Sequence, residues 1–484
     1  MQHSVHPMRQ AGTDLQPEAV PPQRLHLLAR RLSALRRDRR GTAAVLIALS
    51  TSALFGMAAL ATEAGSWYLV RRNAQTAADA AAMASAISMA NGAAASSIIA
   101  IGRDVASRNG FTDGGDGGRT SVLVSASANA SPAQLSVTVQ QTQQLLFAHA
   151  LMQQPAVVRA TAQAVAMNDP GGACVLALHM AVTFAGNSNV QAPNCGFASN
   201  VRDPNSFKFG SGGSDAGGSF TARLSSLVSM GGCLTCTTAQ NLLKLTFTRN
   251  RPALYQARTA NPYASLEAGL PSTVKVNTCS QTSKLDSDPD GSTISLPPGC
   301  YGSIRVTGGK TLQLSPGVYV ISKGDFYVAG GTTVNCPTCS SSNGVTIIMT
   351  GSNGNAENTG ALTIQANANV DLIARNTGTS GDLDGVLFYR DSRAANGTNN
   401  GSVPVSITGG PAVKLRGAIV APSSSVLFTG SSSTSTDPSA ATSCTVFVVG
   451  GMTFQGGSGL DTSGCSAIGT RLPTLRLIQL VNAG

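Results

Sequence analysis

Cysteine is the residue type in this chain whose number and spacing point most directly to chemistry. The 484 residues include ten cysteines, and all of them lie between Cys174 and Cys465. An even number of cysteines confined to one part of a chain is typical of disulfides formed in an oxidising compartment. The spacing suggests sequential pairs, although sequence alone does not fix the connectivity: Cys174–Cys195, Cys233–Cys236, Cys279–Cys300, Cys336–Cys339 and Cys444–Cys465.

Two of these pairs have the Cys-x-x-Cys spacing of zinc ligands, at Cys233 and Cys236 and again at Cys336 and Cys339. Four thiolates would make a reasonable zinc site, but a separation of about 100 residues is too wide for a compact zinc ribbon. We therefore favour disulfides over a metal site at both positions.

An acidic stretch resembles the first half of a calcium-binding loop, with Asp286, Asp288 and Asp290 at alternate positions. The twelfth position of that loop is Pro297, where a bidentate Glu is needed. A solvated acidic turn is the favoured interpretation, and a weak calcium site is the alternative. We expect no other cofactor.

The search for catalytic groups finds no activated constellation. Of the five histidines, only His149 and His179 follow the long apolar segment described below, and neither lies in a motif for nucleophilic catalysis. One charged cluster has the residue types found in enzymes that cut acidic polysaccharides: Asp382, Asp384, Arg390, Asp391 and Arg393. Charged residues that flank a strand are more often solvent-exposed turn residues. We expect no catalytic residues and no enzymatic activity.

An uncharged apolar run from Thr42 to Thr62, which includes Leu46 and Leu54, can place the cysteine-containing part of the chain outside the cytoplasm. Its length is about that needed to cross a ~30 Å hydrocarbon core as a helix. Arginines crowd the residues before it, and Trp67 and Tyr68 follow it at a place that suits the outer membrane interface. We expect a single-pass inner-membrane anchor with its N-terminus in the cytoplasm.

Residues 1–40 form the predicted basic cytoplasmic tail. Residues 1–41 hold eight arginines and three acidic residues, which is half of the net charge of +10. The rest of the chain is nearly balanced, so nucleic-acid binding is not expected. Two alternatives to the anchor are a cleaved signal peptide, for which Ala59-Leu60-Ala61 offers a cleavage pattern, and a buried core helix.

Residues 41–168 predict a membrane helix that continues into a small α+β domain. The Ala-rich helix extends from Thr42 to about Asn91, and its stripe at Ala77, Ala81 and Ala84 allows close packing or a simple stalk. A second helix is expected at Ala95–Arg108 and a third at Leu145–Met152. Alternating apolar residues predict strands near 122–124, 135–139 and 157–167.

Residues 169–484 predict an all-β exported domain. Leu296-Pro297-Pro298-Gly299-Cys300-Tyr301 is repeated as Leu314-Ser315-Pro316-Gly317-Val318-Tyr319, eighteen positions later. A repeat of about 20 residues with short strands suits a parallel β-helix, or solenoid. An antiparallel sandwich or barrel is the alternative.

The segment over residues 36–91 resembles the TadE/TadG-like Flp pilus-assembly family. The resemblance consists of RRDRRG before the apolar run, then an acidic residue, an aromatic pair, LVRR and QTAADAAAMASA. Five residues after Gly41 stands Leu46, where processed pseudopilins of this system carry Glu, which favours the larger, uncleaved TadG-like type. A long N-terminal helix followed by a small antiparallel sheet is the plan of pilin-like proteins, and by that analogy we expect residues 41–168 to include a pilin-like α+β domain.

The resemblance implies a non-enzymatic component of Flp (tight adherence) pilus assembly, envelope anchoring or cell adhesion. Its implied partners are the inner membrane and other pilus-assembly proteins. Cell-wall polysaccharide is a further candidate partner, and we expect the C-terminal domain in the periplasm or facing the surface. The alternatives are an anchored β-helix enzyme that acts on polysaccharide and a cell-wall or carbohydrate-binding protein.

Overall fold

The computed structural model divides the chain into two compact units, which are described separately. The first comprises Met1–Arg72 with Thr142–Val158, and the second comprises Asn73–Gln141 with Arg159–Gly484. The structure describes residues 40–127, 132–150, 153–210, 220–233, 236, 244–249, 252–268, 279, 289–351, 359–378, 382–394, 403–409, 413–430, 432–433 and 444–481.

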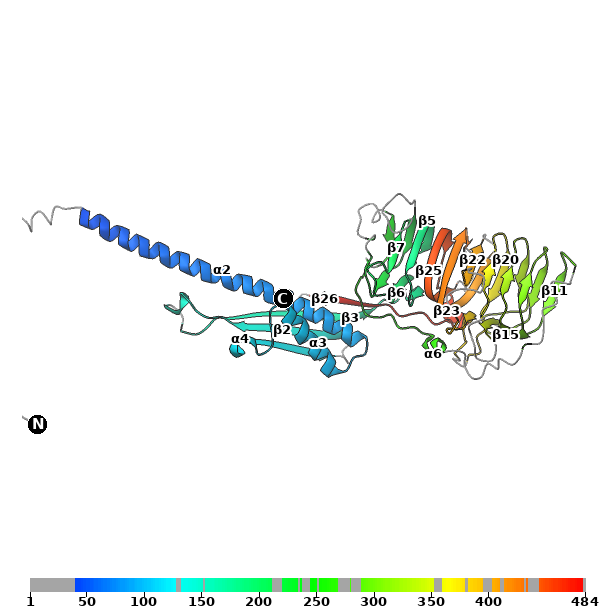
Figure 1. The fold of residues 1–484 in the computed structure, drawn as a ribbon, viewed down its shortest axis with the longest axis horizontal. Coiled ribbons are helices and arrows are strands. Elements are labelled where there is room, and N and C mark those ends of the chain that lie inside the picture. The colour runs from blue at the N-terminus through cyan, green and yellow to red at the C-terminus, as the bar shows by residue number, and fades with distance from the viewer. Residues whose placement is uncertain are drawn as a thin grey trace, which may run out of the picture. The chain divides into compact units, whose positions relative to one another are not determined.

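Helix α2 (Arg40–Ala90) is the longest element of the chain (Figure 1). It begins and ends within two residues of the predicted helix, because Ala-rich sequence without proline sustains it and Asn91-Gly92 ends it. Residues Ala43–Ala90 have the length and apolar composition to cross a membrane, and the most apolar part has none of its residues buried.

The first unit also contains a short 3₁₀ turn, η1 (Ala148–Ala150). The prediction of a helix at Leu145–Met152 is wrong for residues 145–147, which lie before that turn, and residues 151 and 152 lie outside the described part of the chain. The physical reason is that the backbone N–H groups of residues 146–148 bind a side chain of α2 instead of carbonyls one helical turn earlier.

In the second unit, the C-terminal part of α2 packs within its own domain. Ala77 and Ala81 are completely buried, and Ser85 Oγ donates a hydrogen bond of 3.2 Å to the Ile98 carbonyl of helix α3 (Ala95–Arg108). A Cβ at Gly102 would lie 2.7 Å from Ser85 Oγ, so glycine is what allows the two helices to approach this closely. The Ala stripe therefore serves close packing within the chain and not only a stalk.

A four-stranded sheet accompanies these helices, in the order β1-β2-β3-β26. Strands β1 and β2 pair antiparallel, as do β3 and β26. The fourth strand comes from the far end of the chain, because β26 aligns Arg476 with Asn168 and Val481 with Gln163. The elements here are α4 (Gly115–Gly118), β1 (Thr120–Ser127), β2 (Ala133–Thr142), β3 (Val157–Asn168) and β26 (Arg476–Val481).

Residues 173–459 contain a 22-stranded sheet whose strands pair in parallel, with a short helix α6 (Ala264–Glu267) and, after it, a turn η4 (Cys465–Ile468). The strands are β4 (Ala173–Ala177), β5 (Val182–Ala192), β6 (Gly196–Ser199), β7 (Phe207–Phe209), β8 (Thr221–Leu224), β9 (Leu227–Ser229), β10 (Leu245–Phe247), β11 (Thr293–Leu296), β12 (Gly299–Tyr301), β13 (Ile304–Val306), β14 (Thr311–Leu314), β15 (Gly317–Ser322), β16 (Phe326–Val328), β17 (Thr333–Asn335), β18 (Val345–Thr350), β19 (Leu362–Ile364), β20 (Asn369–Ile373), β21 (Val386–Arg390), β22 (Val405–Gly409), β23 (Val413–Gly430), β24 (Ser432–Ser433) and β25 (Thr445–Gly459).

From β11 to β20 the pairing follows a regular rule, in which each strand pairs with the strand three later in chain order. Thus β11 pairs with β14, β14 with β17 and β17 with β20. Of the sequence repeat, Leu296 pairs with its counterpart Leu314, whereas Tyr301 pairs with Ile321, two residues beyond its counterpart. The prediction of a β-rich region is confirmed, and the parallel pairing of its strands is contrary to the antiparallel sandwich.

The chain enters and leaves this sheet at neighbouring strands. The first strand, β4, and the long β5 both pair in parallel with the last strand, β25. From β4 and β5 the chain continues through β6–β10, which lie on one side of β25. It then resumes at β11 on the other side and returns strand by strand to β25 (Figure 1). The sheet region is therefore an insertion between β3 and β26, which are themselves paired.

Aromatic side chains line the interior where the first and last strands meet. The Phe184 ring stacks on that of Phe454 at 5.3 Å and on that of Phe209 at 4.5 Å between centroids. All three side chains are no more than 1% exposed. Because equivalent positions of paired strands face the same side, rings at one register form a continuous column that stabilises the stack.

All ten cysteines are paired in the structure, with the sequential partners that the spacing suggests. Three disulfides join cysteines 21 residues apart: Cys174–Cys195, Cys279–Cys300 and Cys444–Cys465. The other two join cysteines three residues apart: Cys233–Cys236 and Cys336–Cys339. Each wide disulfide encloses one whole strand, namely β5, β11 and β25 respectively. The two Cys-x-x-Cys pairs are disulfides in this structure.

The wide disulfides should stabilise the fold more than the narrow ones. In the chain-entropy model, removing Cys444–Cys465 with Cys444→Ala and Cys465→Ala costs about 3 kcal/mol, whereas Cys336→Ala with Cys339→Ala costs roughly 1.5 kcal/mol. Urea denaturation of the detergent-solubilised chain, followed by circular dichroism, measures both. An equal loss in the two double variants would contradict this loop-length account.

Candidate functional site

The Glu63 carboxylate forms the best-defined polar contact beside the apolar segment. Glu63 is only 5% exposed, although the apolar residues of α2 before it are exposed. Its Oε1 accepts the Leu146 N–H at 3.0 Å, and its Oε2 accepts the N–H groups of Phe147 at 2.8 Å and Ala148 at 2.6 Å. Three N–H donors stabilise the carboxylate form and fix the segment at residues 146–148 against the helix.

Sequence reasoning noted Glu63 only as the acid that follows the apolar run and assigned it no role. The partner segment lies more than 80 residues later in the chain, at a separation of 83 for Leu146. No local pattern encodes such a contact. The available signal was an acidic residue placed directly at the end of an apolar helix segment, where an ionised group needs a partner.

The predicted anchor residues all lie on α2. Leu46 is 66% exposed and Leu54 is 62% exposed, and Thr62 Oγ1 donates to the Ala58 carbonyl at 2.8 Å. Tyr68 is exposed and Trp67 half-buried. The side chain of Thr42 lies outside the described part of the structure. An apolar helix surface this exposed requires an apolar environment or partner.

The charged cluster at the end of β21 is buried and bound by its neighbours. The Arg390 guanidinium, 2% exposed, donates to the Thr359 and Gly360 carbonyls and, at 2.7 Å, to Ser424 Oγ. These acceptors precede β19 or lie in β23, so Arg390 joins the strand layers on both sides of its own. Burial lowers the pKa of Arg390 to about 10, against the opposing effect of the Asp391 charge, so it stays charged at neutral pH.

Asp391 is the counter-charge of this cluster. Its completely buried carboxylate accepts the Thr350 hydroxyl at 2.8 Å and two side-chain N–H bonds from Arg393 at 3.0 and 2.7 Å. Burial alone would raise the pKa of Asp391, but the hydrogen bonds from Arg393 and Thr350 outweigh it and hold the pKa below its ordinary value.

The remaining carboxylates of the predicted cluster are also engaged. Asp384 accepts the backbone N–H of Thr377 at 3.0 Å and its hydroxyl at 2.8 and 2.9 Å, and Asp382 accepts the Ser265 hydroxyl at 2.9 Å. The five predicted residues thus lie along one part of the sheet region, and their contacts join strands and loops. This arrangement stabilises the fold.

The predicted calcium loop is described only in part, because Asp286 and Asp288 lie outside the described residues. Asp290 lies 3.9 Å from the ammonium of Lys310. Among the described residues no group of three or more His, Cys, Asp or Glu is arranged to hold a metal ion.

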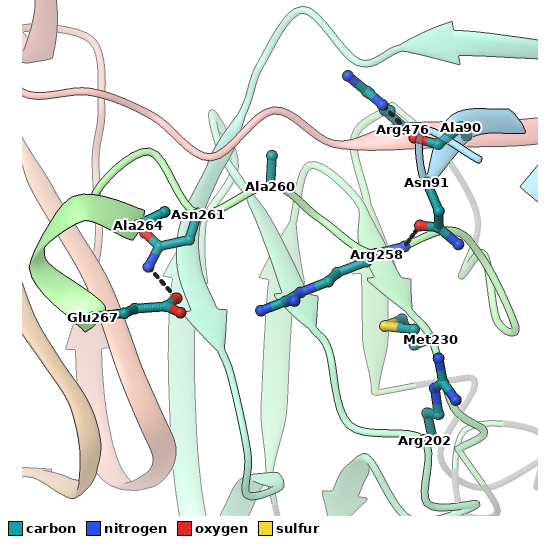
Figure 2. A pocket seen from close by; sticks show the side chains of 11 residues that line it. Ala90, Asn91, Arg202, Met230, Arg258, Ala260, Asn261, Ala264, Glu267 and Arg476 are labelled. Carbon is teal, nitrogen blue, oxygen red and sulfur yellow. Dashed lines mark hydrogen bonds between the residues drawn. The ribbon is translucent and has the colours of Figure 1, made fainter. Parts of the chain in front are cut away.

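A cavity of about 580 Å³ lies where the end of α2 meets the sheet region. Arg202, Arg258 and Arg476 line it, with Glu267 bound to Asn261 on another side (Figure 2). Arg476 donates to the Ala90 carbonyl, which places a positive charge at the negative end of the helix dipole. The Asn91 side chain accepts the Arg258 backbone N–H at 2.9 Å, so these contacts fix the helix end.

The buried cluster predicts a large cost for removing its acid. Asp391→Asn removes the buried negative charge that pairs with Arg393 and offsets the charge of buried Arg390, and we expect a loss of about 3 kcal/mol in unfolding free energy. The control is Asp104→Asn, since Asp104 forms an exposed ion pair with Arg108 worth well under ~1 kcal/mol. Chemical denaturation at pH 7 compares them, and similar small losses in both variants would be contrary to the prediction.

The same acid predicts a dependence on pH. Because folding lowers the pKa of Asp391, its contribution to stability is present above its unfolded pKa of about 4 and is lost as the pH falls through its lower folded pKa. The stability difference between the unmodified chain and Asp391→Asn should therefore shrink as the pH falls from 7 towards about 3. A difference that stays constant over this range would contradict the assignment.

Comparison with known proteins identifies one segment. Residues 41–91 match the model of the Tad family, described as "Putative Flp pilus-assembly TadE/G-like". No curated protein and no solved structure matches the chain. The matched segment covers nearly all of α2, including Glu63 and the Ala stripe, and leaves the four-stranded sheet and the 22-stranded sheet outside it. The comparison confirms the resemblance to TadE/G-like Flp pilus-assembly proteins over this helix segment, residues 41–91.

Proposed function

We propose that this protein is a non-enzymatic, membrane-anchored component of Flp pilus assembly. The observation that carries the proposal is the coincidence of the Tad-family match at residues 41–91 with α2, a helix apolar enough to cross a membrane. In this account α2 anchors the chain in the bacterial inner membrane through residues 42–62, and the remainder of the chain presents surfaces to partners.

The charge distribution sets the proposed orientation. Arg36, Arg37, Arg39 and Arg40 directly precede the apolar run, and positive residues beside a span are retained on the cytoplasmic side. The N-terminus is then cytoplasmic and the region after Glu63 is outside. The five disulfides support this orientation, because disulfides persist in oxidising compartments such as the periplasm.

The region between β3 and β26 is, in this proposal, a β-solenoid that acts as a binding surface. Parallel pairing of strands three apart is the arrangement that successive solenoid coils produce. Its charged cluster at Arg390 and Asp391 is used within the fold, which supports a structural over a polysaccharide-cutting role. The proposed partners are other pilus-assembly proteins and, on the outer side, cell-wall polysaccharide.

Deletion of the gene tests the proposal in the bacterium that carries it. We expect an in-frame deletion to reduce surface Flp fibres, counted by electron microscopy, and adherence, and expect the full-length gene to restore both. A chain with Leu49→Asp and Leu54→Asp should not restore them, because two acids at the centre of the span disfavour insertion by roughly 6 kcal/mol.

The matched control for the anchor variant is Leu123→Asp, because Leu123 is an exposed leucine of β1, 64% exposed, that lies outside the apolar run. This variant should restore fibres and adherence, and membrane fractionation should find it with the membranes. Unchanged fibres and adherence in the deletion strain would refute the pilus-assembly role.

A further inference from the structure

Two large apolar side chains are exposed on the segment that Glu63 holds. Leu146 is 74% exposed and Phe147 is 54% exposed, whereas the next residue, Ala148, is 2% exposed. The backbone N–H groups of all three residues are bound to the Glu63 carboxylate. The exposure of these side chains is therefore a property of a fixed segment and not of a loose one.

Phe147 continues the apolar surface of α2. Together with Phe55, Leu60 and the small residues between them it lines a groove of about 720 Å³ on the helix. Phe55 is 72% exposed and Leu60 is 40% exposed. At ~1.5 Å rise per residue, Phe55 lies about 12 Å along the helix from Glu63, so the groove extends over the last turns of the apolar run.

The hydrogen bonds to Glu63 also solve a problem specific to membranes. Backbone N–H groups outside a regular helix are tolerated in hydrocarbon only where another protein group satisfies them. The carboxylate satisfies three consecutive N–H groups at the point where the segment reaches the apolar helix surface. In return, three donors compensate the charge of Glu63, so this boundary can be depleted of water at low cost.

We propose that residues 146–148 are a second membrane contact, in which Leu146 and Phe147 insert into the outer leaflet beside α2 and lipid acyl chains occupy the groove. This inference rests on the proposed function, in which residues 42–62 cross the membrane. Continuity of the groove with that span identifies lipid as the occupant. Glu63 is the positioning residue, because it holds the segment without contacting the acyl chains itself.

Single-tryptophan reporters in the full-length chain test this contact. Trp67 is the only tryptophan, so Trp67→Phe provides a background without tryptophan fluorescence. Into it we would place Phe147→Trp on the segment, Phe55→Trp on the span and Leu123→Trp on β1 as an exposed control. Each chain is reconstituted into phosphatidylethanolamine and phosphatidylglycerol vesicles with and without brominated acyl chains, which quench only tryptophans that reach the hydrocarbon.

We expect the bromolipid to quench Phe147→Trp to an extent comparable with Phe55→Trp, and to leave Leu123→Trp unchanged. Quenching at Phe55→Trp but not at Phe147→Trp would overturn the second contact while the anchor stands. Lack of quenching at Phe55→Trp would instead refute the anchor on which this inference rests.

A second variant tests the role of Glu63. Glu63→Gln replaces one acceptor oxygen by an NH₂ group that faces an N–H donor, so the quenching of Phe147→Trp should fall while that of Phe55→Trp stays. The matched control is Asp79→Asn, an acid-to-amide change on the same helix whose carboxylate binds Gln75. Equal quenching of Phe147→Trp with and without Glu63→Gln would overturn the positioning role.

Discussion

One uninterrupted helix with two kinds of surface is the constraint on which the rest of this molecule depends. Before Glu63, α2 bears large apolar side chains that are exposed, and after residue 73 it bears alanines that are buried in their own domain. A large exposed apolar surface is unfavourable in water, so the first part needs a bilayer or a partner. The second part already has its apolar contacts. Glu63 lies between these two parts of the helix, and Tyr68 and Leu69 after it are still exposed.

The second constraint is topological. The 22-stranded sheet begins and ends at paired strands, and the four-stranded sheet that flanks this insertion also pairs its two sides, β3 with β26. Because β26 comes last in the chain, the four-stranded sheet is complete only after the whole insertion has been made. The apolar part of α2 and its packed part thus come first in the chain, and the large sheet region is inserted after them without interrupting the helix.

Much of this architecture is predictable because it is local. Alanine content and the Asn91-Gly92 stop fix the end of α2, and period-two alternation finds the strands of the small sheet. The repeat at Leu296 and Leu314 reports the pairing of β11 with β14 directly, because equivalent residues of adjacent strand layers occupy equivalent environments. The family resemblance rests on the same helix segment.

The unpredictable features are contacts between residues far apart in sequence. Apolar residues at 145–147 look helical, and only the distant Glu63 explains why their segment is not a helix. Arg390 and Asp391 look like surface charges beside a strand, since burial depends on strand layers placed by residues more than 30 positions away. No local sequence pattern predicts the pairing of β26 with β3 in the four-stranded sheet either.

Topology mapping tests most directly the central claim that α2 holds the β-rich region outside the cytoplasm. Alkaline phosphatase and green fluorescent protein would be fused separately after residue 484 and expressed in the bacterium. The account predicts an active phosphatase, which needs the oxidising periplasm, and a non-fluorescent green fluorescent protein fusion. A fluorescent fusion together with an inactive phosphatase would place the β-rich region in the cytoplasm and contradict the account.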